Sequence, residues 1–386
     1  MSRAALTLLT VWLAAANLRA AIFALQPVLP DIRRDLGLSF SAAGGLTSMA
    51  LAALGVASIP GLYVGWRLGA RRTVAVMALG IAVASVIRLA PPATLTIFAG
   101  SAALAACVAF SQPAVTVLLR QWFASRLQQA SGVFSNGILV GGTVGASATP
   151  LAAGLTGWRG TFWLWAAVSV AVAAIWWGTT PRTDLRVPRL RVRDALRSLR
   201  AWQVTALFTF QNLAYFCVAA WLPFLLAQSS SGYVAWVFTC LNLLPIVPLL
   251  VLPALRWSYA TSPWFYFGSG LVVVAGAGGL ALGLHQLAWA LAFLIGLGCA
   301  AAFVGAMALA PVIAESDQEA AAITAIVFTF GYILAFAGPL LGGYLVDDTH
   351  DVRTGFWPSI GAGAMMTVLG LIVPRLLAPD ALETPA

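Results

Sequence analysis

Arg19 is the residue of this sequence whose chemistry is easiest to define. It lies near the middle of an apolar run over residues 4–30, with no charged neighbour within two helical turns. At the centre of a bilayer an arginine costs roughly 2.5 to 3.5 kcal/mol on insertion scales. It must therefore face a wet cavity or find a partner. Its guanidinium can present a planar fork of donors to a carboxylate or similar anion. The alternative is a structural arginine that bonds to the carbonyls of broken helices.

Several neutral polar residues interrupt other apolar runs at a similar depth. Gln26 follows Arg19 by seven residues, which on a continuous helix is almost the same face, about 10 Å further along. Arg88 ends the third run close to the outside surface, where its head can reach water. For each residue of this group, ligand contact and hydrogen bonding between helices stay open. The remaining candidates for ligand contact are Gln112, Asn136, Asn212, Tyr215 and Tyr332.

The composition requires membrane helices to position these residues. Of 386 residues, 61% are hydrophobic and only 9% are charged, too few to cover a soluble core. We expect an all-α membrane protein with twelve spanning helices in two pseudo-symmetric bundles of six. The expected spans are 4–30, 40–64, 73–90, 94–119, 129–152, 161–178, 201–227, 232–255, 263–283, 288–312, 321–346 and 356–377.

The charges predict the topology. All 21 basic residues are arginines, and they lie mostly in alternate gaps between the runs, which places both termini in the cytoplasm. The basic segment 179–200 divides a bundle over 1–178 from one over 201–378, and 379–386 form a short tail. We expect the tryptophans at the span ends to be interfacial anchors. They include Trp158, Trp163, Trp165, Trp176, Trp177, Trp257 and Trp264.

Several function classes are excluded. The positions of the arginines in alternate gaps are explained by membrane topology, so no nucleic-acid partner is expected. The sequence has no Gly-Lys-Ser/Thr motif that would support an ATP-driven pump. The stretches Gly137–Gly145 and Gly338–Gly343 instead predict close packing between helices of the two halves. The four cysteines lie inside apolar runs without ligand spacing, which predicts buried thiols and no metal or cofactor. The acidic residues lie at span ends or in loops, which argues against a carboxylate proton relay through the core.

Short motifs recur at equivalent places in the two halves. Asn17-Leu18 in the first run matches Asn212-Leu213 in the seventh, and Phe134-x-x-Gly137 matches Phe328-x-x-Gly331 in the eleventh. Such weak internal likeness is typical of duplicated transporter folds.

With these features the chain resembles the major facilitator superfamily. Asn17-Leu18-Arg19, the segment from Pro27 to Ile32 and Ala220-Trp221-Leu222-Pro223 are similar to its cyanate permease and nitroimidazole transporter branch. The resemblance implies alternating access between two six-helix bundles and gives Arg19 a substrate-site role. The superfamily's gating motif after the second span survives only as Arg67, Gly69, Arg71 and Arg72, with Trp66 where an aspartate is usual.

We therefore expect a monomeric, multi-pass transporter of a bacterial cytoplasmic (inner) membrane, and not an enzyme. The expected cargo is a small anion with Arg19 as its charge partner. The alternative is efflux of small neutral or weakly basic heteroaromatic compounds that stack on aromatic side chains of the seventh and eleventh spans.

Overall fold

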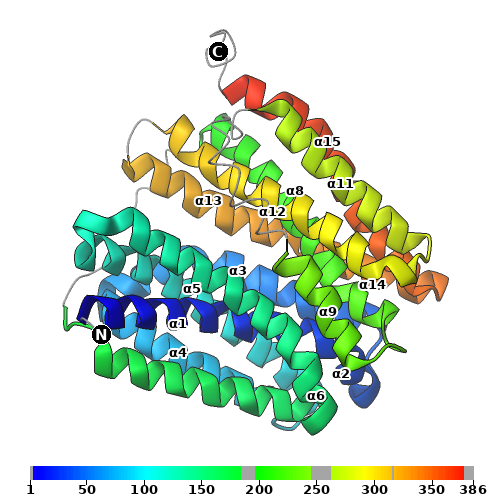
Figure 1. Ribbon diagram of the computed structural model, residues 1–386, viewed down its shortest axis with the longest axis horizontal. Coiled ribbons are helices and arrows are strands. Elements are labelled where there is room, and N and C mark those ends of the chain that lie inside the picture. Colours follow the sequence, from blue (N-terminus) through cyan, green and yellow to red (C-terminus); the bar gives the residue numbers. More distant parts are fainter. Residues whose placement is uncertain (1–2, 184–195, 245–261, 315–316, 378–386) are drawn as a thin grey trace. The chain divides into compact units, whose positions relative to one another are not determined.

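The computed structural model describes residues 3–183, 196–244, 262–314 and 317–377. Over these ranges the chain is helical and contains no strand, as the composition predicts (Figure 1). The elements in chain order are α1 (Arg3–Phe23), η1 (Gln26–Val28), α2 (Leu29–Leu36), α3 (Phe40–Leu68), α4 (Ala70–Ile87), α5 (Ala93–Trp122), η2 (Ala124–Arg126), α6 (Leu127–Thr179), α8 (Leu199–Leu225), α9 (Ser231–Asn242), α11 (Pro263–Ala281), η5 (His285–Leu287), α12 (Ala288–Ile313), α13 (Asp317–Ala335), α14 (Ala337–Thr349), η6 (Val352–Phe356) and α15 (Trp357–Leu377).

The helices account for the twelve expected spans. Ten helical stretches among the described residues are long and apolar enough to cross a membrane. One of them, α6, is 53 residues long and contains a break at Gly157 (φ 70°, ψ 170°), so it supplies the fifth and the sixth span. The eighth span begins with α9, and its remainder over 245–261 lies outside the described residues.

The chain forms two compact units. Unit 1 comprises Met1–Gly37 and Met49–Arg189, and unit 2 comprises Leu38–Ser48 and Leu190–Ala386. Most of the basic segment expected to divide the bundles, residues 184–195, and the expected tail lie outside the described parts of the chain. The first turns of α3 belong to unit 2, although the rest of that helix belongs to unit 1.

In unit 1, α1 runs along α6 over a row of glycines (Figure 1). A Cβ on Gly141 would lie 2.1 Å from the Ala16 carbonyl oxygen, and one on Gly145 would lie 2.5 Å from the Ala20 carbonyl oxygen. Only glycine permits this approach of the two backbones. The expected close packing is confirmed. The expectation that it joins the two halves is wrong for Gly137–Gly145, because α1 and α6 both belong to unit 1. Gly343 of the second stretch does lie against Phe40 and Ser41, which belong to the first half of the sequence.

In unit 2, glycines also lie against α8. A Cβ on Gly331 of α13 would lie 2.4 Å from the Phe208 ring, and one on Gly338 of α14 would lie 2.8 Å from Leu213 Cγ, so the nearest atoms here are side-chain atoms. The motifs that recur in the sequence thus fall on corresponding helix pairs, α1 with α6 and α8 with α13. Side-chain packing explains the correspondence, since a small residue every few positions is what a close helix crossing requires.

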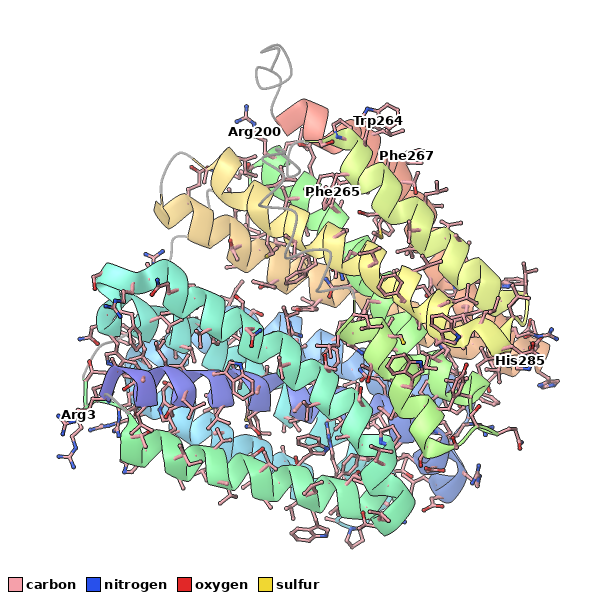
Figure 2. The ribbon with its side chains drawn as sticks, in the orientation of Figure 1. Arg3, Arg200, Trp264, Phe265, Phe267 and His285 are labelled. Carbon is pink, nitrogen blue, oxygen red and sulfur yellow. The ribbon has the colours of Figure 1, made fainter. Side chains whose placement is uncertain are left out.

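The tryptophans divide into two groups. Trp163, Trp177 and Trp264 are about half exposed or more, as interfacial anchors must be. Figure 2 shows Trp264 projecting outward at the start of α11, with His285 beyond its other end. The anchor prediction is wrong for Trp158, Trp165 and Trp176, which are at least 93% buried and pack between helices. Trp257 lies outside the described residues.

Candidate functional site

Arg19 lies on the part of α1 that faces α6. Its side chain is half-buried, and the guanidinium carbon is 5.8 Å from the centre of the Phe23 ring. A Cβ on Gly142 of α6 would lie 3.6 Å from that ring and 3.9 Å from Arg19 Cβ. The arginine and the ring therefore sit over a helix surface without side chains. A guanidinium over an aromatic face is favourable, and its N–H donors, which lie in the guanidinium plane, do not point into the ring.

Asn17 fixes the rotation of α1 about its axis. Its Oδ1 accepts a 2.8 Å hydrogen bond from Ser169 Oγ in the second half of α6, and the side chain is 97% buried. Residues two apart on a helix point in nearly opposite directions, so anchoring Asn17 on one side orients Arg19 toward the other. Asn17 was not among the predicted site residues, although its position in Asn17-Leu18-Arg19 was a visible signal.

Asn136 and Gln112 lie on neighbouring helices of the same unit. Trp12 Nε1 donates a 2.8 Å hydrogen bond to Asn136 Oδ1, two helical turns before Arg19 on α1. Gln112 on α5 is half-buried, and its backbone carbonyl accepts from Thr116 Oγ1 at 3.2 Å. Both amides thus belong to the unit that carries Arg19, and Asn136 shares with it the α1–α6 contact.

Gln26 does not continue the helix of Arg19. The helix α1 ends at Phe23, and Gln26 begins the 3₁₀ turn η1 because Pro27 cannot extend the preceding hydrogen-bond ladder. The expected common stripe with Arg19 is therefore interrupted. Gln26 is 98% buried, and within the described residues its Oε1 has no hydrogen-bond partner. A buried acceptor of this kind is suited to a water molecule or a solute donor.

Arg88 is buried, and the expectation that its head reaches water is wrong. The residue is 2% exposed and its guanidinium carbon lies 5.1 Å from the centre of the Phe162 ring. Its stem passes Gly100, where a Cβ would lie 2.8 Å from Arg88 Cγ. The space above Gly100 lets the side chain turn into unit 1, and that space could not be foreseen from the sequence.

In unit 2 the polar residues of α8 pair with one another and with α9. Asn212 Nδ2 donates to Gln211 Oε1 at 2.9 Å and to the Phe208 carbonyl at 2.8 Å. One turn later, Tyr215 donates its hydroxyl to Asn242 Oδ1 at 2.6 Å. Asn212 and Tyr215 therefore make helix contacts in this structure.

Tyr332 belongs to an aromatic cluster on α8 and α13. Its ring stacks on Phe328, with centres 5.9 Å apart and an interplanar angle of 14°. Both rings meet the edge or face of Phe208 near 5.4 Å. Tyr332 and Phe208 are buried, whereas Phe328 is half-buried and offers free ring surface.

The residues of the shortened gating motif lie at the turn between α3 and α4. Gly69 has a φ of 82°, which a side chain would oppose. Arg71 is 7% exposed, and it donates from Nε to Thr180 Oγ1 at 3.0 Å and from Nη2 to the Trp177 carbonyl at 2.5 Å. It thereby caps the carboxyl end of α6. Arg67 lies over the Tyr63 ring at 5.2 Å, and Arg72 is exposed.

The described residues provide no group of three His, Cys, Asp or Glu side chains able to hold a metal ion. The four cysteines are free, and three of them are buried. The predicted substrate-site residues thus lie in two sets. One set is on α1, η1, α5, α6 and the end of α4 in unit 1, and the other is on α8 and α13 in unit 2.

Comparison with known proteins agrees with this architecture. The chain is 27% identical over 352 residues to an uncharacterized transporter, YycB, of Bacillus subtilis (strain 168), covering 87% of this chain and 85% of the relative. It is 27% identical to the 2-nitroimidazole transporter of Escherichia coli (strain K12), covering 94% and 93%. It is 26% identical to the cyanate transport protein CynX of the same organism, covering 88% and 89%.

Solved structures share the fold at lower identity. A bacterial homolog of the human lysosomal transporter Spinster, in an inward-facing and occupied conformation, superposes with a TM-score of 0.81 at 14% identity over 98% of both chains. A bacterial homologue of the human peptide transporters PepT1 and PepT2 gives 0.75 at 16% identity over the full length of both. The Major Facilitator Superfamily model matches residues 11–291, and the chain therefore belongs to the Major Facilitator Superfamily.

Proposed function

We propose that this transporter of small solutes moves a small anion by alternating access, with Arg19 as the charge partner of the solute. The observation that carries the proposal is the position of Arg19, a half-buried cation on α1, a helix that contains no acidic residue. A cation within a membrane helix is expensive unless it serves a solute or a structural partner. Attraction between two opposite charges is stronger in a low-dielectric environment than in water.

The surroundings of Arg19 support a binding role over a purely structural one. The Phe23 ring covers one face of the guanidinium, while Gly142 leaves the adjacent surface of α6 without a side chain. Asn17 and Ser169 hold α1 in this rotation from the opposite side. The cation is therefore oriented by its neighbours, which lowers the entropic cost of binding a planar anion.

One relative with a named solute supports the anion proposal. Cyanate is a small linear anion, and the relative that carries its name aligns over 88% of this chain. The proposal extends the charge class to this chain and leaves the individual anion to experiment.

Uptake of labelled small anions into proteoliposomes tests the proposal. Replacing Arg19 by Gln removes the charge and should abolish saturable uptake, whereas Arg19→Lys should retain uptake with a raised KM because it loses the planar fork. Arg126→Gln is the matched control, since Arg126 is exposed and lies outside both the site and the gating motif, so this variant should transport like the wild type. Unchanged uptake by Arg19→Ala would sink the assigned role.

A second candidate function is efflux of a small heteroaromatic compound. The half-buried Phe328 ring stacked on Tyr332 favours it, because such a ring can stack on a flat ligand. The relative named as a 2-nitroimidazole transporter aligns over 94% of this chain. Drug tolerance in an overexpressing strain that falls on Phe328→Ala and is unaffected by competing anions would favour this function over anion transport.

A further inference from the structure

The start of α3 is docked into unit 2. Residues 38–48 belong to that unit, whereas α3 from Met49 onward belongs to unit 1. A single continuous helix of 29 residues is thus divided between two compact bodies. Whatever holds its first turns in unit 2 also decides whether they can leave it.

Asp347 of α14 caps the start of α3. The first N–H groups of a helix have no acceptor within the helix. The N–H of Phe40 donates to Asp347 Oδ1 at 2.9 Å, and the N–H of Ser41 donates to Oδ2 at 2.7 Å. The Ser41 hydroxyl bonds to the same carboxylate. The next N–H, from Ala42, is accepted by Ser39 Oγ at 3.0 Å. Two of the first-turn donors therefore depend on one carboxylate from a distant part of the sequence.

Close packing continues the contact along the next two turns. A Cβ on Gly44 would lie 2.2 Å from the Pro339 carbonyl oxygen, so the two backbones touch at this point. Ser48 Oγ donates to the Phe336 carbonyl at 2.6 Å, and Ser48 is fully buried. The docked position is thus defined by steric fit as well as by the cap.

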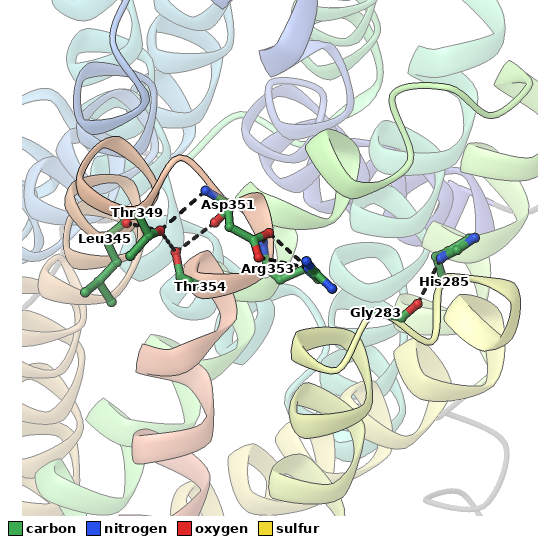
Figure 3. Close-up of polar contacts among 7 residues, drawn as sticks. All are labelled: Gly283, His285, Leu345, Thr349, Asp351, Arg353 and Thr354. Atoms are coloured by element: carbon green, nitrogen blue, oxygen red, sulfur yellow. Dashed lines mark hydrogen bonds and ion pairs between the residues drawn. The ribbon is translucent and has the colours of Figure 1, made fainter.

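The end of α14 that carries Asp347 is itself well held. Thr349 Oγ1 donates to the Leu345 carbonyl at 2.6 Å and lies 2.8 Å from Thr354 Oγ1, which donates to the Asp351 carbonyl at 2.8 Å (Figure 3). These bonds order the turn after α14. The backbone that carries the Asp347 carboxylate is therefore held in place by hydrogen bonds on its carboxyl side.

The charged groups that lie next to residues 38–48 on the chain are Arg33, Arg34 and Asp35 at the end of α2. Residues 38–48 contain none, and α8 presents the fully buried Trp221 to this region, with its own charge, Arg200, almost six helical turns earlier. Asp348 and His350 follow on the same chain segment, both exposed. Asp351 and Arg353 of the adjoining turn are bonded to each other at 2.9 Å. Arg375, whose side chain lies outside the described set, is on the last turn of α15.

We propose that Asp347 is a proton-operated clasp on α3. The ionised carboxylate accepts the three donors of Phe40 and Ser41 and carries the negative charge that a helix start favours. Binding of one proton from water gives a neutral carboxylic acid, which removes the charge and converts one acceptor oxygen into a donor. The docked state is therefore favoured at high pH and is lost as the pH falls. Release frees the start of α3 from Asp347, and its use in transport rests on the mechanism proposed above.

Hydrogen exchange of the purified full chain in nanodiscs tests the clasp directly. The backbone N–H groups of Phe40 and Ser41 are protected by Asp347 and not by the helix itself. In the wild type their protection, corrected for the intrinsic pH dependence of exchange, should fall about tenfold or more between pH 8 and pH 5. Asp347→Asn should show the low value at both pH values. Asp348→Asn is the matched control. Asp348 is the next residue and is exposed, so this variant should behave like the wild type.

Ser41→Ala keeps the test decisive if Asp347→Asn fails to fold. It retains the carboxylate and both N–H donors but removes the hydroxyl bond, so release should occur at a higher pH, by about one unit. Equal protection of the wild type at pH 8 and pH 5 overturns the proposal, as does wild-type protection in Asp347→Asn. No solute is present in this measurement, so its result is independent of whether Arg19 binds an anion.

Discussion

Gly141 offers the sharpest test of how unit 1 is held together. Replacing it by alanine adds a Cβ 2.1 Å from the Ala16 carbonyl oxygen, 2.4 Å from Ala16 Cα and 2.5 Å from its carbonyl carbon. All three atoms are backbone, so no side-chain rotation relieves the clash. To reach an ordinary contact of about 3.4 Å, α1 must withdraw by roughly 1.3 Å at this point.

The magnitude follows from two opposing effects. Overpacking of a close contact costs about 1 to 3 kcal/mol, and a clash with backbone belongs at the upper end. Alanine also gains about 0.5 to 1 kcal/mol over glycine inside a helix. Gly132→Ala is the matched control, because it lies in the same helix α6 and nothing lies within 4 Å of the added Cβ. The difference between the two variants isolates the clash, at about 1 to 3 kcal/mol.

Unfolding of the two purified variants by denaturing detergent measures this difference. Gly141→Ala should unfold earlier than the wild type and Gly132→Ala at the same point or later. Gly142→Ala should be tolerated, since its Cβ would meet Phe23 at 3.6 Å, an ordinary contact. Anion uptake should also fall in Gly141→Ala, because Arg19 lies less than one turn beyond Ala16. Equal stability of Gly141→Ala and Gly132→Ala would refute the reasoning.

Three further predictions concern the ends of the helices. Arg71→Ala removes two hydrogen bonds at the end of α6 and should lower stability by about 1 to 3 kcal/mol, whereas exposed Arg72→Ala should stay within about 0.5 kcal/mol in the same denaturation assay. Trp221→Ala should cost about 3 to 5 kcal/mol, and Trp221→Phe clearly less, since the indole Nε1 has no partner in the described structure. The Arg353 guanidinium and N–H hold the pKa of Asp351 below its ordinary 3.8. Wild type should therefore be slightly more stable than Asp351→Asn at pH values above 3.8. This difference should vanish as the pH falls through the lowered pKa of Asp351, and melting temperature measured against pH tests it.

The class of protein was predictable because hydropathy is a local property. A run of about 20 apolar residues must span a bilayer whatever its neighbours are. The sixth span merges with the fifth across Gly157, and yet the expected count still accounts for the described helices. The break after Phe23 was harder to foresee, although Pro27 was a visible signal.

The contacts of the polar residues were not predictable in the same way. Tyr215 was recognised as an intramembrane polar residue, but its pairing with Asn242 depends on how α8 and α9 cross. Arg88 is buried only because Gly100 leaves room for its stem. These contacts depend on the distance between two helices, and the residue pattern within one helix carries no information about that distance.

The sequence by itself therefore determined that this chain lies in a membrane and that Arg19 falls inside one of its apolar runs. Only the tertiary structure decided that Asn17 orients Arg19, that the glycines of α6 bind α1 within one unit, and that Asp347 caps α3. The physical reason is that hydrophobic burial can be read residue by residue, whereas a hydrogen bond or a glycine contact is a property of two segments brought together in space.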